Sequence, residues 1–576
     1  MYLRKVSKYK DGKAHHYWAL VQSYRTERGP RQRTVAWLGE VAEDSKLVLK
    51  TERSTPPDQR DLFAEREAQW VEVNTQTLRV ENIVDFGGPW LGLQLIRLLG
   101  LDRFLCEHLP RGKEEIPWDV MAQVLVLCRL CHPCSELEIA EDYFEKSALA
   151  DLLGIPKGKI NDDRLYRALD RLLPYKRELE KHLKERVGTL FSLSYDLFLY
   201  DVTSVYFEGE AEANPLAQRG YSRDKRGDLK QVCIALVVTR DGFPLGYEVF
   251  SGNRTDVTTV EEIVEEMEGR YGQAERIWVM DRGMGSEENF EFLNKNGRRY
   301  IVGANRNQLK RYERELLQRD WVNVQEGLEV KKVESPDGKE VYILCRSHSR
   351  ALKEAAMHER FEKRIEEALT RAAASASKRR YRAGLLERRI GRILERNSRA
   401  AGLFDIQVTQ EAEGFSKVRW RKRESFREWS ALSEGCYLLR SNVMDWSPED
   451  LWKAYIQLTE AEDAFRIHKS DLSIRPIWHQ KEERVRAHIL VCFLAYVLWK
   501  TLEGFCRQGG LGDAPAKVFK DLSGIKLVNV VMSTRQGIPV TLRCVSTPTT
   551  HQAILLQRLG LHLPNRFPMK ECSGNF

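Results

Sequence analysis

The sequence predicts a multidomain α/β protein built around a mixed five-stranded sheet, and two features of residues 193–305 carry this prediction. First, three strand-like runs follow one another, with Asp241-Gly242 as a tight turn between the second and the third. Second, strands and helices then alternate, beginning with a helix at about 257–271 and a strand that ends at Asp281. With 576 residues, 42% of them hydrophobic, the chain can form several domains with real cores.

A three-stranded meander followed by strand–helix alternation is the RNase H-like arrangement, in which the first and fourth strands lie side by side. The first strand, Leu197–Phe207, carries Asp201 in its middle, and the fourth, Arg276–Asp281, ends in a second aspartate. A helix at 286–297 and a strand at Tyr300–Gly303 continue the pattern. Bare carboxylates in apolar strands are costly unless a metal or a reaction needs them. The two aspartates therefore predict a divalent-metal site for phosphoryl transfer.

The other segments are predicted from composition and periodicity. Residues 1–40 form a small basic β-rich region, and the polar residues 41–80 form a linker. Apolar residues at helical spacing make 81–192 an all-helical unit, which could place a helix in a DNA groove or only pack against the core. Residues 306–445 are predicted to be an insertion of strands and long charged helices. Residues 446–510 would form the second part of the core, and residues 511–576 a C-terminal tail region.

Basic residues cluster at two places, although the whole chain has a net charge of only +8. Residues 1–40 carry nine Lys/Arg against three Asp/Glu, and residues 378–399 carry nine against two. Such clusters favour contact with a polyanion, although a solvated helix face is the preferred interpretation of either one alone. Trp420 lies among the cations of Lys417–Arg423, where it could stack on an unpaired base or simply anchor a strand.

The eleven cysteines are scattered through a long chain, which argues against a disulfide framework. Cys128, Cys131 and Cys134, with His132 between them, resemble half of a zinc site. Cys128 and Cys131 continue an apolar helical run and no second ligand pair follows nearby, so buried core thiols are expected instead. No apolar run of membrane-spanning length and no signal-peptide core is found, which predicts a cytoplasmic, nucleoid-associated protein with no membrane partner.

A third acidic residue is predicted on a helix that begins at Ser447-Pro448, a good N-cap and first-turn pair. In this helix Tyr455, Glu462 and Lys469 recur every seven residues, so they share one face. Glu462 lies among apolar neighbours on that face and is the expected ligand. Glu460 is the alternative if the register differs, and an ordinary amphipathic helix with ion pairs is the simpler interpretation of the whole pattern.

Eight stretches occur in a characteristic order along residues 85–510. They are Tyr200–Ser204, Gly220–Arg226, Pro244–Tyr247, Gly252-Asn253, Met280–Met284, the helix around Glu462, Arg475–His479 and Arg484–Ile489. Together they resemble the DDE transposases of bacterial insertion sequences, in the IS4-like superfamily and closest to its IS1634-type group. The superfamily signature Y-(2)-R-(3)-E-(6)-K is matched by Tyr455, Glu462 and Lys469, but Leu458 stands at the arginine position.

The resemblance implies that Asp201, Asp281 and Glu462 are the catalytic and metal-binding residues of a DNA transposase. They would hold two Mg²⁺ ions, which Mn²⁺ could replace, with Asp201 between them. Water attack would cut the ends of the insertion sequence, and the freed 3′-hydroxyl would then attack target DNA.

The resemblance also implies partners and further contacts. Double-stranded DNA, as element ends and target, is the expected partner, and two copies of the chain are expected in the synaptic complex. Tyr455 and Lys469 would contact DNA phosphates, with Arg282 and Arg466 as further candidates. Two alternatives remain open: an RNase H-like nuclease without strand transfer, and a catalytically inactive DNA-binding protein derived from a transposase.

Overall fold

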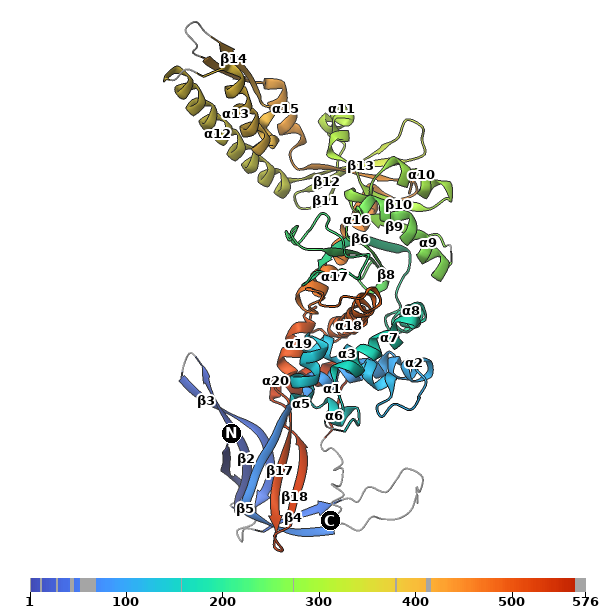
Figure 1. The fold of residues 1–576 in the computed structure, drawn as a ribbon, viewed down its shortest axis with the longest axis vertical. Helices are drawn as coiled ribbons and strands as arrows, with labels where there is room; N and C mark the ends of the chain where they lie inside the picture. Colours follow the sequence, from blue (N-terminus) through green and yellow to red (C-terminus); the bar gives the residue numbers. More distant parts are fainter. Residues whose placement is uncertain are drawn as a thin grey trace.

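The computed structural model describes the chain except residues 1, 11–12, 27–28, 42–45, 52–68, 157, 273, 379–380, 411–415 and 565–576, with side chains from Glu72 onward. A nine-stranded mixed sheet lies at the centre, in the order β11-β12-β13-β16-β10-β9-β6-β7-β8 (Figure 1). Residues 193–305 supply β6 (Leu197–Tyr206), β7 (Gln231–Val238), β8 (Pro244–Ser251), β9 (Ile277–Met280) and β10 (Arg299–Gly303). β6 to β8 form an antiparallel meander, and β9 pairs in parallel with β6 and with β10. The predicted meander and the adjacency of the first and fourth strands are confirmed.

The prediction of only five strands is wrong, because the insertion extends the sheet beyond β10. Its additional strands are β11 (Val322–Gln325), β12 (Leu328–Glu334), β13 (Val341–Ser347) and β16 (Cys436–Ser441). β12 and β13 form an antiparallel hairpin, and β16 pairs antiparallel with both β13 and β10. An unpaired edge at β10 would leave backbone donors and acceptors without partners, so the returning chain pairs with it.

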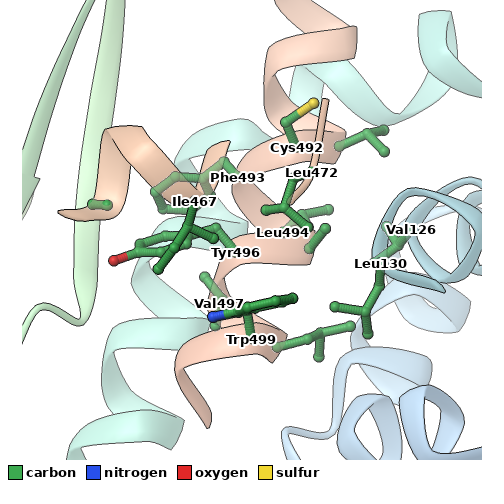
Figure 2. Packing of buried hydrophobic residues seen from close by; sticks show 14 of the residues in the cluster. Val126, Leu130, Ile467, Leu472, Cys492, Phe493, Leu494, Tyr496, Val497 and Trp499 are labelled. Carbon is green, nitrogen blue, oxygen red and sulfur yellow. The ribbon is translucent and has the colours of Figure 1, made fainter. Parts of the chain in front are cut away.

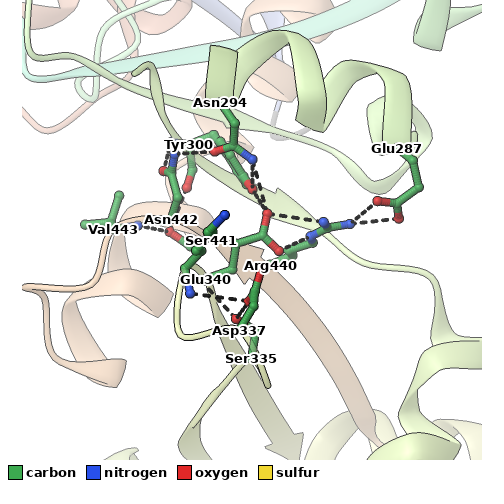
Figure 3. A network of polar contacts seen from close by, with 11 residues as sticks. Glu287, Asn294, Tyr300, Ser335, Asp337, Glu340, Arg440, Ser441, Asn442 and Val443 are labelled. Carbon is green, nitrogen blue, oxygen red and sulfur yellow. Dashed lines mark hydrogen bonds and ion pairs between the residues drawn. The ribbon is translucent and has the colours of Figure 1, made fainter. Parts of the chain in front are cut away.

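A polar network fixes this junction between β10, β13 and β16 (Figure 3). Arg440 on β16 donates to Glu340 over 2.7 Å and to Glu287 of α10 (Glu287–Lys295) over 2.8 Å. The Tyr300 hydroxyl on β10 also donates to Glu340. Because Arg440 and Glu340 are largely buried, each must keep its charged partner, and the network holds the insertion in register with the sheet.

Helices cover both faces of the sheet. Phe198, Tyr200 and Val202 of β6 pack with α9 (Val260–Tyr271) and α10 on one face. Because side chains alternate along a strand, Asp201 points to the opposite face, which α17 (Thr459–Ser470) covers.

The long helix α18 (Glu482–Gln508) forms the core between the sheet and the N-terminal helices (Figure 2). In Figure 2, Val126 and Leu130 of α3 (Trp118–Cys131) face its side chains, among them Leu494 and Trp499. In the described residues, α18 alone is long and apolar enough to cross a membrane, but 89% of its apolar window is buried inside the protein. This agrees with a core helix.

The region before the core is mainly helical from residue 87 to residue 191, whereas residues 81–85 of the predicted helical unit belong to strand β5 (Gln69–Asp85). Its main helices are α1 (Gly87–Leu98), α2 (Leu101–His108), α3, α7 (Asp162–Leu172) and α8 (Lys176–Phe191), with the short α4 (Glu136–Glu138), η1 (Ile139–Tyr143), α5 (Phe144–Lys146) and α6 (Leu149–Leu152). Glu180 of α8 is fully buried and pairs with Arg270 of α9. This buried ion pair attaches the helical layer to the core.

The predictions of a linker at 41–80 and of a tail region at 511–576 are wrong, because strands from these two segments pair with each other. They supply most of a second sheet, with β4 (Lys46–Thr51), β5 (Gln69–Asp85), β17 (Lys526–Thr534) and β18 (Pro539–Val545) in the order β18-β17-β5-β4. Buried Val528, Val530 and Met532 pack with Val73 of β5. The C-terminal part also forms α19 (Pro515–Leu522) and α20 (Thr550–Arg558), whereas the polar residues 52–68 lie outside the described residues.

At the N-terminus, the predicted strands are confirmed as a three-stranded antiparallel sheet of β1 (Tyr2–Lys10), β2 (Lys13–Thr26) and β3 (Gly29–Val41). In the insertion, the long charged helices are α12 (His348–Lys378) and α13 (Ala383–Arg396). They form a separate core with the hairpin of β14 (Phe404–Gln410) and β15 (Ser416–Lys422), and this arm projects away from the central sheet (Figure 1). α14 (Ser398–Ala401) and α15 (Glu424–Ser433) complete the insertion.

Gly252 provides a test of the packing beside the meander. A methyl group at this position would lie 1.9 Å from the Gln231 carbonyl oxygen, so Gly252→Ala is expected to destabilise the protein by about 1–3 kcal/mol. At Gly269 in α9, a methyl group would have no atom within 4 Å. Gly269→Ala is therefore the matched control, and it should stabilise the protein by up to about 1 kcal/mol. Thermal melting of the two variants measures the difference, and equal melting temperatures would contradict this packing.

Candidate active site

Asp201 is a largely desolvated carboxylate in the middle of the buried strand β6. Its side chain accepts a hydrogen bond of 2.8 Å from the Val202 N–H. The pKa of Asp201 is raised to about 7, and burial is the largest cause. The Val202 N–H and Arg223 lower this pKa, while the charges of Asp281 and Glu462 raise it by smaller amounts. The surrounding positive charge therefore does not offset the cost of burying the ionised carboxylate.

Asp281 follows β9 directly and is exposed at the end of the sheet. In the parallel pair of β6 and β9, Tyr200 lies opposite Met280. Asp201 and Asp281 are the next residues on the two strands, so the backbone places the two carboxylates at neighbouring positions. Asp281 also lines a cavity of about 660 Å³ that lies between the sheet and the base of the insertion.

Glu462 lies on the exposed side of α17 and is electrostatically coupled to the aspartates. Burial raises its pKa, and Asp281 contributes the next largest effect in the same direction. Asp201, Asp281 and Glu462 are thus near enough for their charges to affect one another's pKa values. Glu460, the alternative ligand, instead lies 3.5 Å from the ammonium of Lys500 and beside the turn at Gly242.

The single helix predicted after Ser447 is interrupted, which corrects the sequence interpretation. α16 spans Pro448–Ile456, and α17 begins only at Thr459. The Leu458 N–H bonds to the Tyr455 carbonyl over 3.0 Å, three residues back rather than four, which tightens the backbone at this point. Leu458 is buried at the arginine position of the family signature, so packing occupies this position.

Tyr455 and Arg282 lie beside Asp281. The Tyr455 hydroxyl lies close to Gly303 at the end of β10. A methyl group on that glycine would be only 2.7 Å from the hydroxyl oxygen. Burial and the charge of Asp281 raise the pKa of Tyr455, so this phenol stays protonated as a hydrogen-bond donor. Arg282 is exposed and lines both the cavity at Asp281 and a second cavity of about 590 Å³ that leads towards the arm.

Lys469 is held by a carboxylate that the sequence interpretation missed. It lies 3.1 Å from Asp224, which also pairs with Arg475 over 2.7 Å. One Asp224 oxygen, Oδ2, is buried without a hydrogen-bond partner. These three residues fix the loop after β6 to the end of α17.

Arg223 on the same loop is a second missed residue. Its backbone N–H donates to the Ser204 hydroxyl over 3.2 Å, and its guanidinium pairs with Asp256. Its charge lowers the pKa of Asp201. The stretch Gly220–Arg226 was part of the family resemblance, but no local pattern indicated that it folds over the aspartates.

Arg466 and Trp420 do not join this group. Arg466 is exposed on α17 and pairs with Asp463 over 3.0 Å. Trp420 on β15 packs against the separate core of the arm. The alternative that Trp420 anchors a strand therefore fits the structure better than an exposed stacking platform.

The three acids fit a hard divalent cation, because carboxylate oxygens are the ligands that Mg²⁺ and Mn²⁺ prefer. Ionised Asp201 would gain from nearby positive charge, and the Arg223 guanidinium already lowers its pKa. Among the described residues, groups of three or more potential ligand atoms within 4.8 Å of one another occur at two other places. The ligand oxygens of Asp201, Asp281 and Glu462 are therefore not all within that distance in this structure.

Comparison with known proteins identifies the class. Residues 192–498, more than half of the chain, match the family described as transposase DDE domain. Residues 3–57 match the family described as IS1634 family transposase, N-terminal domain. The chain therefore belongs to the DDE transposases of the IS1634 group, which cleave DNA and transfer strands with divalent metal ions, and the predicted resemblance is confirmed.

One solved structure similar to the chain is that of piggyBac transposase in a synaptic complex with hairpin DNA, determined by cryo-EM. The two are 8% identical with a TM-score of 0.37, over 75% of this chain and 79% of that chain. Comparison with curated proteins found no match.

Replacing Asp201 by Asn is expected to stabilise the folded protein at pH 8 in the presence of EDTA. The folded-state pKa of about 7 lies above the ordinary value of 3.8, so the folded state binds the proton more tightly and stability falls as the pH rises across that window. The amide keeps the shape but cannot ionise. The expected gain is on the order of 1–3 kcal/mol at pH 8, disappearing near pH 4.

Urea denaturation at the two pH values measures this gain. Asp463→Asn, which changes an exposed acid on α17, is the matched control and should have little effect at either pH. Equal stabilities of Asp201→Asn and the wild type at pH 8 would contradict the burial of an unfavourable charge.

Proposed function

We propose that this transposase cuts the ends of an insertion sequence and joins them to target DNA with Asp201, Asp281 and Glu462 as its catalytic residues. The observation that carries the proposal is the adjacency of the two aspartates on paired parallel strands, Asp201 within β6 and Asp281 directly after β9. Glu462 of α17 supports it, because its charge affects the pKa of Asp201 and its own pKa is raised by Asp281. The strand order of β6 to β10 supports an RNase H-like core. The insertion then extends that core rather than forming a wholly separate domain.

Asp201, Asp281 and Glu462 would together hold two Mg²⁺ ions, and Mn²⁺ could take their place. When bound, such ions lower the pKa of water and stabilise the charge on attacking and leaving oxygens. The residues of the chain orient the DNA around them. Arg223, whose charge lowers the pKa of Asp201, and Lys469 are each already held by a carboxylate.

Tyr455 and exposed Arg282 are proposed to contact the phosphates that flank the cut, because both lie beside Asp281. The basic β-rich region 1–40 and the helical layer 81–192 are proposed to bind the element ends. Synapsis of two ends needs two copies of the chain, and the projecting arm of α12 and α13 is the proposed surface between them. The DNA substrate would place the protein at the nucleoid of a bacterial cell.

Asp201→Asn, Asp281→Asn and Glu462→Gln are each expected to abolish cleavage and strand transfer while DNA binding persists. An amide keeps the side-chain shape but cannot neutralise a divalent cation, so the expected loss is at least about 100-fold. Cleavage and joining are measured with labelled element ends in Mg²⁺, and binding by gel shift. Glu460→Gln is the matched control on the same helix, because Glu460 contacts Lys500 instead.

The same assay with pre-cleaved ends separates the alternatives. Mg²⁺-dependent cutting without joining would favour a nuclease, and DNA binding without either reaction would favour an inactive derivative. Full activity of all three triad variants would refute the site assignment.

A pair of variants on α17 tests the phosphate contacts. Lys469→Met is expected to lower strand transfer by about tenfold or more, because a charge-assisted phosphate contact contributes about 1.5–3 kcal/mol. Arg466→Met, which removes an exposed arginine paired with Asp463, should retain nearly full activity. Melting temperatures check that both variants fold. Equal activity of the two variants would contradict a phosphate contact by Lys469.

A further inference from the structure

The turn between α3 and α4 brings three different metal-ligand types together outside the active site. Ligand atoms of His132, Cys134 and Glu138 all lie within 4.8 Å of one another. His132 Nε2 is 3.4 Å from Glu138 Oε1, and both side chains are about half exposed, at 48% and 51%. The cluster is therefore open to an ion from solvent.

Neighbouring contacts hold all three residues in this arrangement. The His132 ring stacks on Tyr143, with ring centroids 4.5 Å apart and planes inclined by 19°. The Glu138 N–H bonds to the Ser135 hydroxyl over 3.2 Å, and the Cys134 carbonyl accepts from Arg129 over 3.2 Å. Supporting contacts of this kind fix ligand orientation at metal sites.

The ligand types select a borderline-soft cation. Zn²⁺ binds thiolate, imidazole and carboxylate together, whereas Mg²⁺ takes oxygen ligands and disfavours sulfur. A Cys134 thiolate and the Glu138 carboxylate would balance the charge of Zn²⁺. Cys134 would lose its proton to solvent on binding, and the fourth position would be filled by water.

The other two cysteines of the motif do not complete the site. Cys128 is fully buried in the main core. The Cys131 sulfur faces α1, about 3.7 and 3.8 Å from the positions of methyl groups on Gly92 and Gly88. The expectation of core thiols therefore holds for Cys128 and Cys131, whereas Cys134 faces His132 and Glu138.

The second cluster in this region, Glu136–His479–His488, is less suited to a metal. Glu136 lies 3.4 Å from His479 Nε2, and His488 Nε2 contacts the Ile474 carbonyl over 3.1 Å. The Arg129 guanidinium lies 3.5 Å from His488 Nδ1 and opposes a further cation there. This buried cluster acts instead as a polar contact between the helical layer and the segment between α17 and α18.

We propose that His132, Cys134 and Glu138 bind one Zn²⁺ ion that fixes the turn between α3 and α4. The chain bends by 103° at this turn. Glu136, in the same turn, pairs with His479 beyond α17. A metal here would therefore set the position of the helical layer against the part of the core that carries Glu462.

The test uses the full chain stripped of metal with a chelator and then titrated with Zn²⁺ against a chromophoric competitor. The wild type is expected to take up one tightly bound Zn²⁺ per chain. Cys134→Ser and Glu138→Gln should bind more weakly by at least about 10–100-fold, since even indirect supporting residues cost that much. Cys106→Ser, which changes an exposed cysteine on α2, is the matched control and should bind as the wild type does.

Two further measurements make the outcome specific. Co²⁺ in place of Zn²⁺ should give a sulfur-to-metal charge-transfer band that Cys134→Ser removes and Cys106→Ser keeps. The variant carrying Asp201→Asn, Asp281→Asn and Glu462→Gln should still bind Zn²⁺, which separates this site from the active site. Wild-type binding no tighter than that of Cys134→Ser, or a charge-transfer band that survives this substitution, would overturn the proposal.

Discussion

The burial of one carboxylate in the centre of an apolar sheet is the constraint around which the rest of this protein is arranged. Asp201 sits in β6 between residues that are almost completely buried, and burial raises its pKa to about 7. Its carboxylate accepts a hydrogen bond from the adjacent Val202 N–H. A group held at such cost stays in a protein when the reaction uses it. The neighbouring elements supply the further acids and the surrounding positive charge.

The pairing and packing around β6 hold Asp201 in this unfavourable position. β6 is paired on both sides, and α18 packs between the sheet and the helical layer, so the backbone of Asp201 cannot relax. Glu462 comes from a helix that is attached through Lys469 and Asp224 to the loop after β6. The sheet extension anchors Tyr455 and Arg282 beside the second aspartate, because β16 continues the sheet next to β10. Each charged side chain thus reaches the site from an element fixed by packing elsewhere.

Much of the central fold could be predicted from the sequence, because its signals are local. The Asp241-Gly242 turn and the change from helical to strand periodicity at residue 193 define the meander, and the order of elements then places Asp201 beside Asp281. The regular spacing of Tyr455, Glu462 and Lys469 pointed to Glu462, whose charge does affect the pKa of Asp201, although the helix is interrupted between Tyr455 and Glu462. Long-range pairings were not visible in this way. β5 and β17 lie more than 400 residues apart in the chain, so neither segment alone indicates its partner.

The features of the site that the sequence did not predict also depend on contacts formed only in the folded chain. At the break between α16 and α17, the N–H groups of Leu458, Glu460 and Ala461 each bond to the carbonyl three residues back, a local change that no periodicity reveals. The pairs Arg223–Asp256 and Lys469–Asp224 join residues from different elements, and each partner alone looks like an ordinary surface charge. The loop after β6 could only be placed once the fold was known.

The most direct test of this account is a crystal structure of the full chain with a pre-cleaved element end and Mn²⁺, with the metal located by anomalous scattering. We predict anomalous peaks that contact the carboxylate of Asp201 and, between them, those of Asp281 and Glu462. Peaks bound to other acids, such as Asp256 or Glu460, with Glu462 remaining outside the metal coordination, would contradict it.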